Sequence, residues 1–420
     1  MPDPQQIPSS SPAPAKRRRK MSATIAAVAV FGGIVAVGAP ALAYMDNGRE
    51  GVRTALSGSR ENGHGDGAWN PAVQRRAEGL VRDGFPGVLA AVQGKDGRTT
   101  DYVAGVGDRA TGAKPPVNGR VRAASNTKPF VSTVVLQLVA AGKVKLDAPI
   151  ETYLPGLVRG RGIDARKITV RNLLQHTSGL PNYTQYMDQN AFNTRDIYKE
   201  PRELLDSAFQ HPADFRPGTK WAYSNTNYIL AGLLVQRITG RPIGEEITKR
   251  IIGPLGLRDT YWPQVGERDI RGPHPKGYDA PKPGAPLADL TRQDPSWGWA
   301  AGQLVTTPRD LNRFFGGLLG GKLLPPAQLR EMTKTVPSPD GMPNSSYGLG
   351  LFKMKLSCGG VLWGHGGDIN GYETRGGVTA DGRTATVAVT ALPGAIATTE
   401  KDVLRVHQHV LDTVDTAFCS

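Results

Sequence analysis

Ala-Ala-Ser-Asn-Thr-Lys-Pro-Phe, residues 123–130, places a serine three positions before a lysine, directly ahead of an apolar run. Proline lacks an N–H and is tolerated only in the first turn of an α-helix, so Pro129 predicts a helix that begins at about Ser125 or Asn126. One helical turn would then bring the Lys128 ammonium close to the Ser125 hydroxyl. The helix start also offers a backbone N–H and a positive dipole end to a developing oxyanion. The alternative is that Ser125 is an ordinary N-cap.

The N-terminal sequence indicates export. A basic cluster at residues 16–20 is followed by an uncharged apolar run at 21–37 and by Ala-Leu-Ala, the small-residue pattern at which signal peptides are cleaved. We therefore expect a signal peptide over residues 1–43, cleavage after Ala43 and secretion, with a membrane anchor formed by residues 21–37 as the alternative. Residues 44–67 are rich in Gly, Ser, Arg and Asn, and predict a flexible linker.

The chain as a whole has a globular composition. Of its 420 residues, 39% are hydrophobic, which suffices for one large or two ordinary domains. The formal net charge is +14, but the basic residues after residue 43 are scattered, so we expect anionic envelope polymers rather than nucleic acid as partners. The two cysteines, Cys358 and Cys419, predict one structural disulfide, with two free thiols as the alternative. We expect a monomer, and neither a metal nor a cofactor is predicted.

Strands are predicted near both ends of the folded chain, with helices between them. Each strand pair flanks an Asp-Gly turn, and the pairs occupy residues 88–92 with 99–106 and 377–379 with 384–390. Apolar helical runs separated by Gly and Pro loops cover residues 130–141, 170–176, 228–239 and 244–252. We therefore expect an α/β sheet domain, residues 68–122 and 298–420, with an inserted, mainly helical domain, residues 123–297, and an active site between them.

Two further polar stretches carry candidate catalytic residues. In Tyr-Ser-Asn at 223–225, Tyr223 could move a proton and the Asn225 amide could hold a substrate carbonyl; a helix cap and a packed ring are the structural alternative. Trp-Gly-His-Gly-Gly at 363–367 is expected to end a strand and to place the His365 imidazole beside backbone that a substrate can approach. A surface turn is the alternative there.

Taken together, Ser-x-x-Lys, Tyr-x-Asn and His-x-Gly, in this order, resemble the motifs of the serine DD-peptidases and class C β-lactamase-like enzymes. The resemblance is strongest to the secreted D-alanyl-D-alanine carboxypeptidases and extends from about Trp69 to the C-terminus. It includes the stretches 146–155, 168–180, 223–228, 347–351, 356–358 and 417–419. It implies a β-lactamase/DD-peptidase-like fold, in which an antiparallel sheet is flanked by terminal helices and interrupted by a mainly helical domain.

The resemblance also implies an acyl-enzyme mechanism. Ser125 would attack the carbonyl before the last D-Ala, the backbone N–H groups of Ser125 and Asp368 would hold the oxyanion, and water would release the acyl group. Lys128 or Tyr223 would accept the serine proton, which requires a pKa about 3 units below the free value of about 10. Desolvation or nearby positive charge could produce such a shift in Lys128, and the charges of Lys128 and His365 could produce it in Tyr223. The sequence leaves the choice open.

The resemblance also assigns three residues of this chain to a substrate-binding cleft. By resemblance, Asn225 would orient the substrate amide, and Thr184 and Trp297 would line the cleft, with Trp299 as a competitor of Trp297. The expected substrates are peptidoglycan stem peptides or other compounds that contain D-amino acids. β-Lactams are expected as inhibitors or substrates.

The match fails where a carboxypeptidase must bind a terminal carboxylate. In such enzymes we expect an arginine shortly before Leu-Ser-Cys and hydroxyl residues on both sides of the third-motif glycine, where this chain has Phe352, Gly366 and Asp368. Lys353 is a poor substitute because neighbouring strand residues point to opposite faces. Arg375, on the following strand, is therefore the candidate receptor for the carboxylate.

Three hypotheses about function result. The first is a penicillin-binding D-alanyl-D-alanine carboxypeptidase. The second keeps the acylation residues but acts as an esterase, a D-aminohydrolase or a β-lactamase. The third is a catalytically silent module that binds the cell envelope, which the presence of every acylation residue disfavours.

Overall fold

The structure is a computed structural model, and it describes residues 69–339, 341 and 345–420. The predicted signal peptide, its alternative as an anchor, and the predicted linker lie outside these residues. Export therefore stays a prediction. Within the described ranges, no helix is both long and apolar enough to cross a bilayer.

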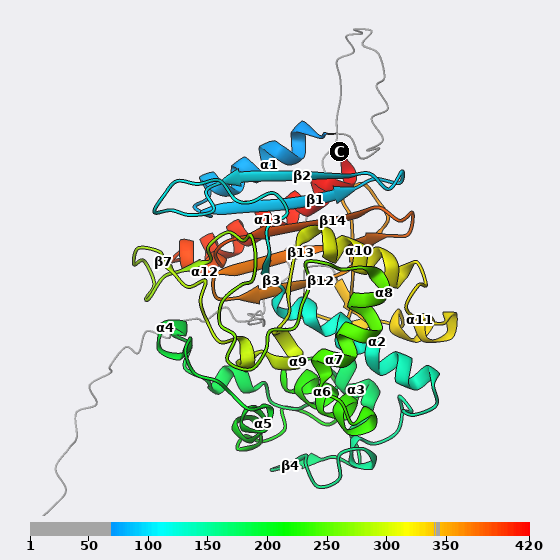
Figure 1. The fold of residues 1–420 in the computed structure, drawn as a ribbon. Helices are drawn as coiled ribbons and strands as arrows, with labels where there is room; N and C mark the ends of the chain where they lie inside the picture. The colour runs from blue at the N-terminus through cyan, green and yellow to red at the C-terminus, as the bar shows by residue number, and fades with distance from the viewer. Residues whose placement is uncertain (1–68, 340, 342–344) are drawn as a thin grey trace, which may run out of the picture.

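An antiparallel sheet of eight strands forms the upper half of the described part of the chain (Figure 1). Its strand order is β2-β1-β14-β13-β12-β11-β10-β9, so the first strands of the chain pair with the last one. The strands are β1 (Gly87–Gln93), β2 (Thr99–Gly105), β9 (Val336–Pro337), β10 (Ser345–Tyr347), β11 (Phe352–Lys355), β12 (Val361–Ile369), β13 (Tyr372–Thr379) and β14 (Thr384–Val389). The sheet is thus assembled from both ends of the chain.

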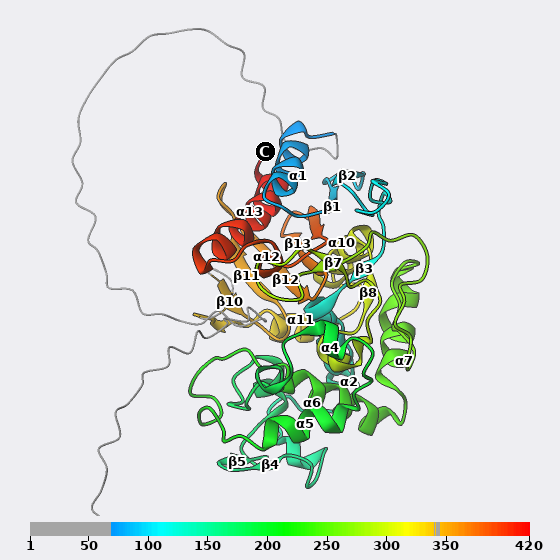
Figure 2. The same ribbon diagram turned by 90° about the vertical axis from the view of Figure 1, so that its left-hand side faces the viewer.

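Helices cover both faces of the sheet. Helices α1 (Pro71–Arg82) and α13 (Glu400–Cys419) lie on one face, and α10 (Pro308–Leu319) lies on the other (Figure 2). In α13 the buried apolar residues recur every three or four positions, which is the spacing of one helix face: Val403, Val406, Val410, Val414 and Phe418. Strand β1 is enclosed between these layers, which explains its almost uninterrupted apolar sequence.

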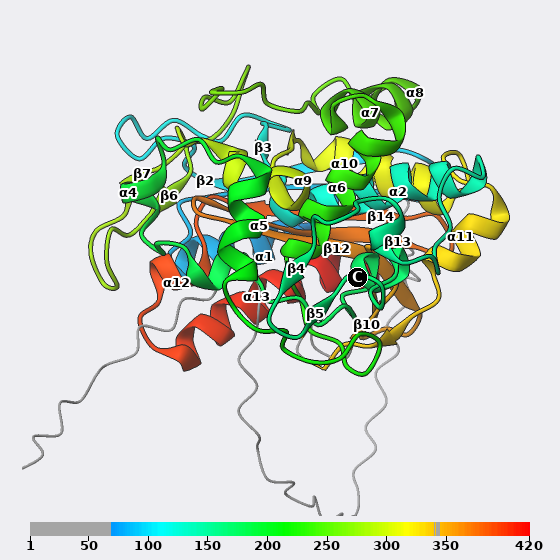
Figure 3. The same ribbon diagram turned by 90° about the horizontal axis from the view of Figure 1, so that it is seen from below.

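A mainly helical region lies below the sheet, and Figure 3 shows α5, α6 and α9 in front of the strands. Its central helix, α2 (Thr127–Ala140), is buried on nearly all sides, as expected for a helix that is apolar all round. The other helices here are α3 (Val170–Leu174), α4 (Ala191–Thr194), α5 (Pro201–Phe209), α6 (Thr226–Thr239), α7 (Ile243–Ile247), α8 (Gly253–Leu255) and α9 (Trp299–Gly302). Helices α11 (Pro326–Met332) and α12 (Pro393–Ile396) flank the sheet.

Among the described residues, three pairs of short strands lie outside the eight-stranded sheet. They are β3 (Val121–Arg122) with β8 (Val305–Thr306), β4 (Arg159–Gly160) with β5 (Ile163–Asp164), and β6 (Tyr278–Asp279) with β7 (Ala288–Asp289). The predicted fold class, an antiparallel sheet flanked by terminal helices and interrupted by a mainly helical segment, is confirmed. The residue boundaries assigned to the two domains remain a prediction.

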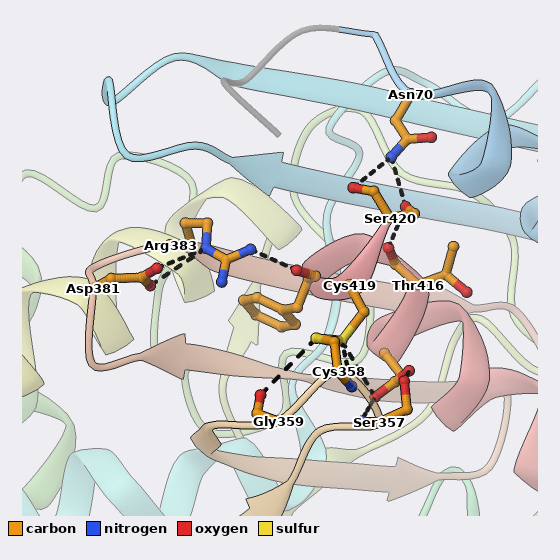
Figure 4. The surroundings of a disulfide bond; sticks show 11 residues. Asn70, Ser357, Cys358, Gly359, Asp381, Arg383, Thr416, Cys419 and Ser420 are labelled. Atoms are coloured by element: carbon orange, nitrogen blue, oxygen red, sulfur yellow. Dashed lines mark hydrogen bonds and ion pairs between the residues drawn. A yellow bond between two sulfur atoms is a disulfide. The ribbon is translucent and has the colours of Figure 1, made fainter. Parts of the chain in front are cut away.

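The predicted disulfide is confirmed (Figure 4). Cys358, in the turn between β11 and β12, is bonded to Cys419 in the last turn of α13. Asn70, just before α1, donates a hydrogen bond of 2.7 Å from its amide to the hydroxyl of Ser420. The two termini of the folded region are therefore fastened at one corner of the sheet.

Candidate active site

A cavity of about 470 Å³ lies where the helical region meets β12. Eight of the residues singled out from the sequence line it: Ser125, Thr184, Tyr223, Asn225, Trp297, His365, Asp368 and Arg375. The ninth, Lys128, is fully buried and reaches this site through its hydrogen bond to Ser125. The fold thus brings together residues that are up to 250 positions apart in the chain.

Ser125 lies in a short 3₁₀ turn, Ala124–Asn126, and α2 begins only at Thr127. The expectation that the α-helix begins at Ser125 or Asn126 was therefore wrong by one or two residues. The preceding residue, Ala124, has φ +48°, a conformation that non-glycine residues rarely adopt and that clusters at functional sites. No side chain caps the N-terminus of α2 through a hydrogen bond, so the N-cap alternative for Ser125 is not supported.

The Lys128 ammonium nitrogen has three hydrogen-bond partners at 2.8 Å: Ser125 Oγ, Asn225 Oδ1 and the carbonyl oxygen of Ala301. The two carbonyl oxygens can only accept, whereas the hydroxyl can also donate. A neutral amine has two N–H groups and one lone pair, so it matches this set with its lone pair toward Ser125. Burial lowers the pKa of Lys128 well below its ordinary value, which favours that neutral form, against a smaller opposing effect of Asp368.

Tyr223 contacts the other side of the nucleophile. Its hydroxyl is hydrogen-bonded to Ser125, and the Lys128 nitrogen lies 4.9 Å from its ring centroid. Burial raises the pKa of Tyr223 well above its ordinary value, and the bond to Ser125 offsets this only in part. The phenol therefore stays protonated at neutral pH, as a proton donor rather than a phenolate.

Asn225, Thr184 and Trp297 form the wall opposite the sheet. The Asn225 side-chain oxygen accepts from Lys128, and its amide nitrogen points to Thr184 Oγ1 at 3.5 Å. Trp297 lines the cavity, whereas its competitor Trp299 is buried and packs where Gly232 leaves space on α6. Of the two tryptophans, only Trp297 can therefore contact a ligand directly.

His365 lies in the middle of β12, not at a strand end as predicted. Its ring is buried, with Nδ1 2.5 Å from the Gly366 carbonyl oxygen and Nε2 3.1 Å from the Tyr347 hydroxyl. Burial lowers the pKa of His365 to about 3, so the ring is neutral at physiological pH. Because both ring nitrogens already have hydrogen-bond partners, His365 has a supporting role in the site.

Sequence reasoning missed a second buried histidine. His176 has φ +58°, and its ring centroid lies 4.3 Å from that of Tyr223. Its Nδ1 accepts from the backbone N–H of Ser224 at 3.2 Å, so His176 fixes the loop that carries Tyr223. The unusual backbone conformation is invisible in the sequence, although His176 lies within one of the family-like stretches. The His, Cys, Asp and Glu side chains of the described residues form no group of three that could hold a metal ion.

Arg375 lines the cavity, but carboxylates of β12 and β13 already bind its guanidinium. Its Nη2 is 2.6 Å from Asp368 Oδ1 and 3.0 Å from Glu373 Oε1, and its Nη1 donates to the Thr374 carbonyl at 2.9 Å. His407 of α13 contacts the same Glu373 oxygen at 3.0 Å. Burial opposes the charge of Arg375, but the two carboxylates outweigh it and raise its pKa.

The departures from the carboxypeptidase pattern now have physical reasons. A Cβ at Gly366 would lie 2.7 Å from Arg375 Nη1, so the guanidinium occupies the space that a hydroxyl residue would need. Phe352 packs in an aromatic group, with its ring centroid 4.6 Å from that of Tyr347. Lys353 is exposed beside Trp363 and does not line the cavity.

The edge of β12 faces the cavity beside Ser125. In the described part of the chain, pairing between β11 and β12 stops at Phe352 and Gly364, so residues 365–369 pair only with β13. A Cβ at Gly367 would lie 2.2 Å from the Ala123 carbonyl oxygen. The lack of a side chain there lets β12 pass directly against the turn that carries the nucleophile.

Comparison with known proteins agrees with this geometry. The sequence model of the β-lactamase family matches residues 72–410. The D-stereospecific amidohydrolase of a Streptomyces species is 41% identical over 80% of this chain and 97% of its own, with a TM-score of 0.72. The D-amino acid amidase of Ochrobactrum anthropi SV3 is 29% identical over 83% of this chain and 98% of its own, with a TM-score of 0.71.

Among curated sequences, esterase EstB of Burkholderia gladioli is 32% identical over 188 residues, 42% of this chain and 47% of its own. The matched region spans less than half the length of such curated relatives. The family model nevertheless covers the sheet, the helical region and all three motifs. The chain belongs to the β-lactamase family of serine hydrolases.

Proposed function

We propose that this protein hydrolyses amides and esters of D-amino acids that carry no terminal carboxylate, through an acyl-enzyme on Ser125. The observation that carries the proposal is that the guanidinium of Arg375 is already bound by carboxylates of this chain. It is the cation nearest to the third motif, and two carboxylates already engage it. A substrate that ends in a carboxylate would have to compete with Asp368 and Glu373 for this guanidinium, whereas an amide or ester would not.

In the proposed mechanism, neutral Lys128 accepts the Ser125 proton as Oγ attacks the substrate carbonyl carbon. Asn225 and the Ala301 carbonyl hold the amine in place through its two N–H groups. The backbone N–H groups of Ser125 and Asp368 stabilise the oxyanion of the tetrahedral intermediate. Tyr223 donates its proton to the leaving nitrogen and regains one from Lys128, so the acyl-enzyme forms with no net change in protonation of the site. Water then attacks the ester by the same route in reverse.

The relatives favour the same substrate class. The Streptomyces relative is named as a D-stereospecific amidohydrolase and the Ochrobactrum relative as a D-amino acid amidase. Both align with this chain over almost their entire lengths. The name of EstB supports ester cleavage on the same scaffold.

The carboxypeptidase favoured by the sequence remains the competing proposal, and one residue supports it. Lys282 lies in the cavity lining, on the loop between β6 and β7, and its side chain is exposed. In the described part of the chain, no carboxylate pairs with it. Lys282 could therefore receive a substrate carboxylate that Arg375 cannot.

The test compares D-Ala-D-Ala as the free acid with its C-terminal amide, each with and without an N-acetyl group, and uses Ser125→Ala as the blank. We expect kcat/KM for the amide to exceed that for the free acid at least tenfold. A preference for the free acid would refute the proposal. If Lys282→Ala then abolished this preference, Lys282 would be the carboxylate receptor.

A further inference from the structure

We infer that Asp368 binds the free α-ammonium group of a D-aminoacyl substrate; the inference rests on the proposed function and specifies what is recognised on the acyl side of the scissile bond. Asp368 directly follows the third motif on β12. Its side chain is 26% exposed, and it lines the cavity from β12. It thus meets any ligand that lies along the open edge of that strand.

One carboxylate oxygen of Asp368 is available to a ligand. Oδ1 accepts from Arg375 at 2.6 Å. In the ranges that the structure describes, no hydrogen bond reaches Oδ2. A carboxylate can accept several hydrogen bonds at once, so Arg375 holds Asp368 in position without exhausting its capacity.

The charges around Asp368 favour a cation. Asp368 and Glu373 carry two negative charges, and the single guanidinium of Arg375 lies between them at 2.6 and 3.0 Å. His407 adds a positive charge only when its ring is protonated, and His365 is neutral. With His407 neutral, the group keeps a net charge of −1, which an ammonium would balance and a carboxylate would double.

The position of Asp368 fits an α-ammonium in particular. Its backbone N–H is proposed to hold the oxyanion. The side chain of the same residue therefore begins close to the carbonyl under attack. In a D-aminoacyl substrate, the ammonium nitrogen and the carbonyl carbon share the α-carbon as their common neighbour. A group that binds both must therefore present a backbone N–H and an anion close together, as Asp368 does.

Asp279 offers a matched control. It is the other carboxylate in the described lining, but its Oδ2 accepts from the Asn370 amide at 2.5 Å. Burial raises the pKa of Asp279, which makes it a weaker anion than an exposed aspartate. It lies on β6, whose Tyr278 forms a β-bridge with Gly371 just beyond the end of β12.

The experiment measures kcat/KM for D-phenylalanine amide and for its N-acetyl derivative in the wild type, Asp368→Asn and Asp279→Asn. The ratio of the two values isolates ammonium recognition, because any general loss of catalysis cancels. We expect the wild type to prefer the free amine at least tenfold, Asp368→Asn to reduce this ratio at least tenfold, and Asp279→Asn to keep it.

The outcomes separate the two proposals. If no amide were cleaved by the wild type, the proposed function would fail. If both amides were cleaved equally well, the function would stand and the inference would be overturned; a ratio lost in Asp279→Asn but kept in Asp368→Asn would also overturn it. Should Asp368→Asn not fold, inhibition of the wild type decides: D-phenylalaninol should inhibit at least tenfold more strongly than its N-acetyl derivative, and equal inhibition would overturn the inference.

Discussion

Replacing Lys128 with methionine tests which residue activates the serine. Methionine is unbranched and of similar length, but it has neither a lone pair for the Ser125 proton nor N–H groups for Asn225 and Ala301. General-base catalysis contributes about 10²–10⁴-fold, or roughly 3–5 kcal/mol of transition-state stabilisation. We therefore expect the acylation rate constant to fall by about that factor.

The assay is the pre-steady-state release of p-nitrophenol from p-nitrophenyl acetate, which reports acylation directly. Circular dichroism of the variant controls for folding, because two carbonyl acceptors lose their donor at a cost of about 1–3 kcal/mol each. An acylation rate within tenfold of the wild type would refute the assignment of Lys128 as the base.

The pH dependence of wild-type acylation gives a second readout of the same prediction. Only neutral Lys128 can accept a proton, and burial lowers the pKa of Lys128 well below its ordinary value. The acylation rate should therefore fall tenfold for each pH unit below the pKa of Lys128 and stay constant above it. The plateau should be reached at a pH well below about 10.4, where free lysine titrates. Burial raises the pKa of Tyr223 instead, so a rate that still rises above about pH 10 would indicate a phenolate base.

Three further predictions concern other parts of the structure. Tyr223→Phe should slow amide hydrolysis about 10²-fold but p-nitrophenyl ester hydrolysis only severalfold, because nitrophenolate leaves without a proton; equal losses would show that Tyr223 is not the acid. Gly367→Ala should reduce kcat/KM about 10²-fold, because the new Cβ would lie 2.2 Å from the Ala123 carbonyl oxygen, whereas Gly394→Ala, which meets nothing within 4 Å, should stay near the wild type. Replacing Cys358 and Cys419 by alanine should lower the free energy of unfolding by about 4 kcal/mol on the loop-entropy model, measured by urea titration; a loss below about 1 kcal/mol would contradict it.

The sequence carried the main elements of the fold and of the site. Asp-Gly turns and continuous apolar runs indicated strands at both ends, and Pro129 located the start of the central helix to within two residues. The first two motifs supplied Lys128 and Tyr223, the side chains that hydrogen-bond to Ser125 in the described part of the chain. These signals are local, so one sequence suffices to find them.

What the sequence did not reveal depends on three-dimensional register. Arg375 was expected to receive a substrate carboxylate, yet the β12–β13 hairpin pairs Asp368 with Glu373 and places Arg375 two residues further along the same face. The turn at Asn370-Gly371 offered a signal for this register, since it fixes which residues face each other across the hairpin. The carbonyl oxygen of Ala301, which holds Lys128, belongs to the main chain and leaves no trace in the residue types.

The account depends most directly on a covalent intermediate at Ser125. The measurement is mass spectrometry of the protein quenched in acid after brief mixing with D-phenylalanine methyl ester, followed by peptide mapping. We expect one added D-phenylalanyl group on the peptide that contains Ser125, and neither adduct nor turnover in Ser125→Ala. Ester turnover that persists in Ser125→Ala, or an adduct on another residue, would contradict the account.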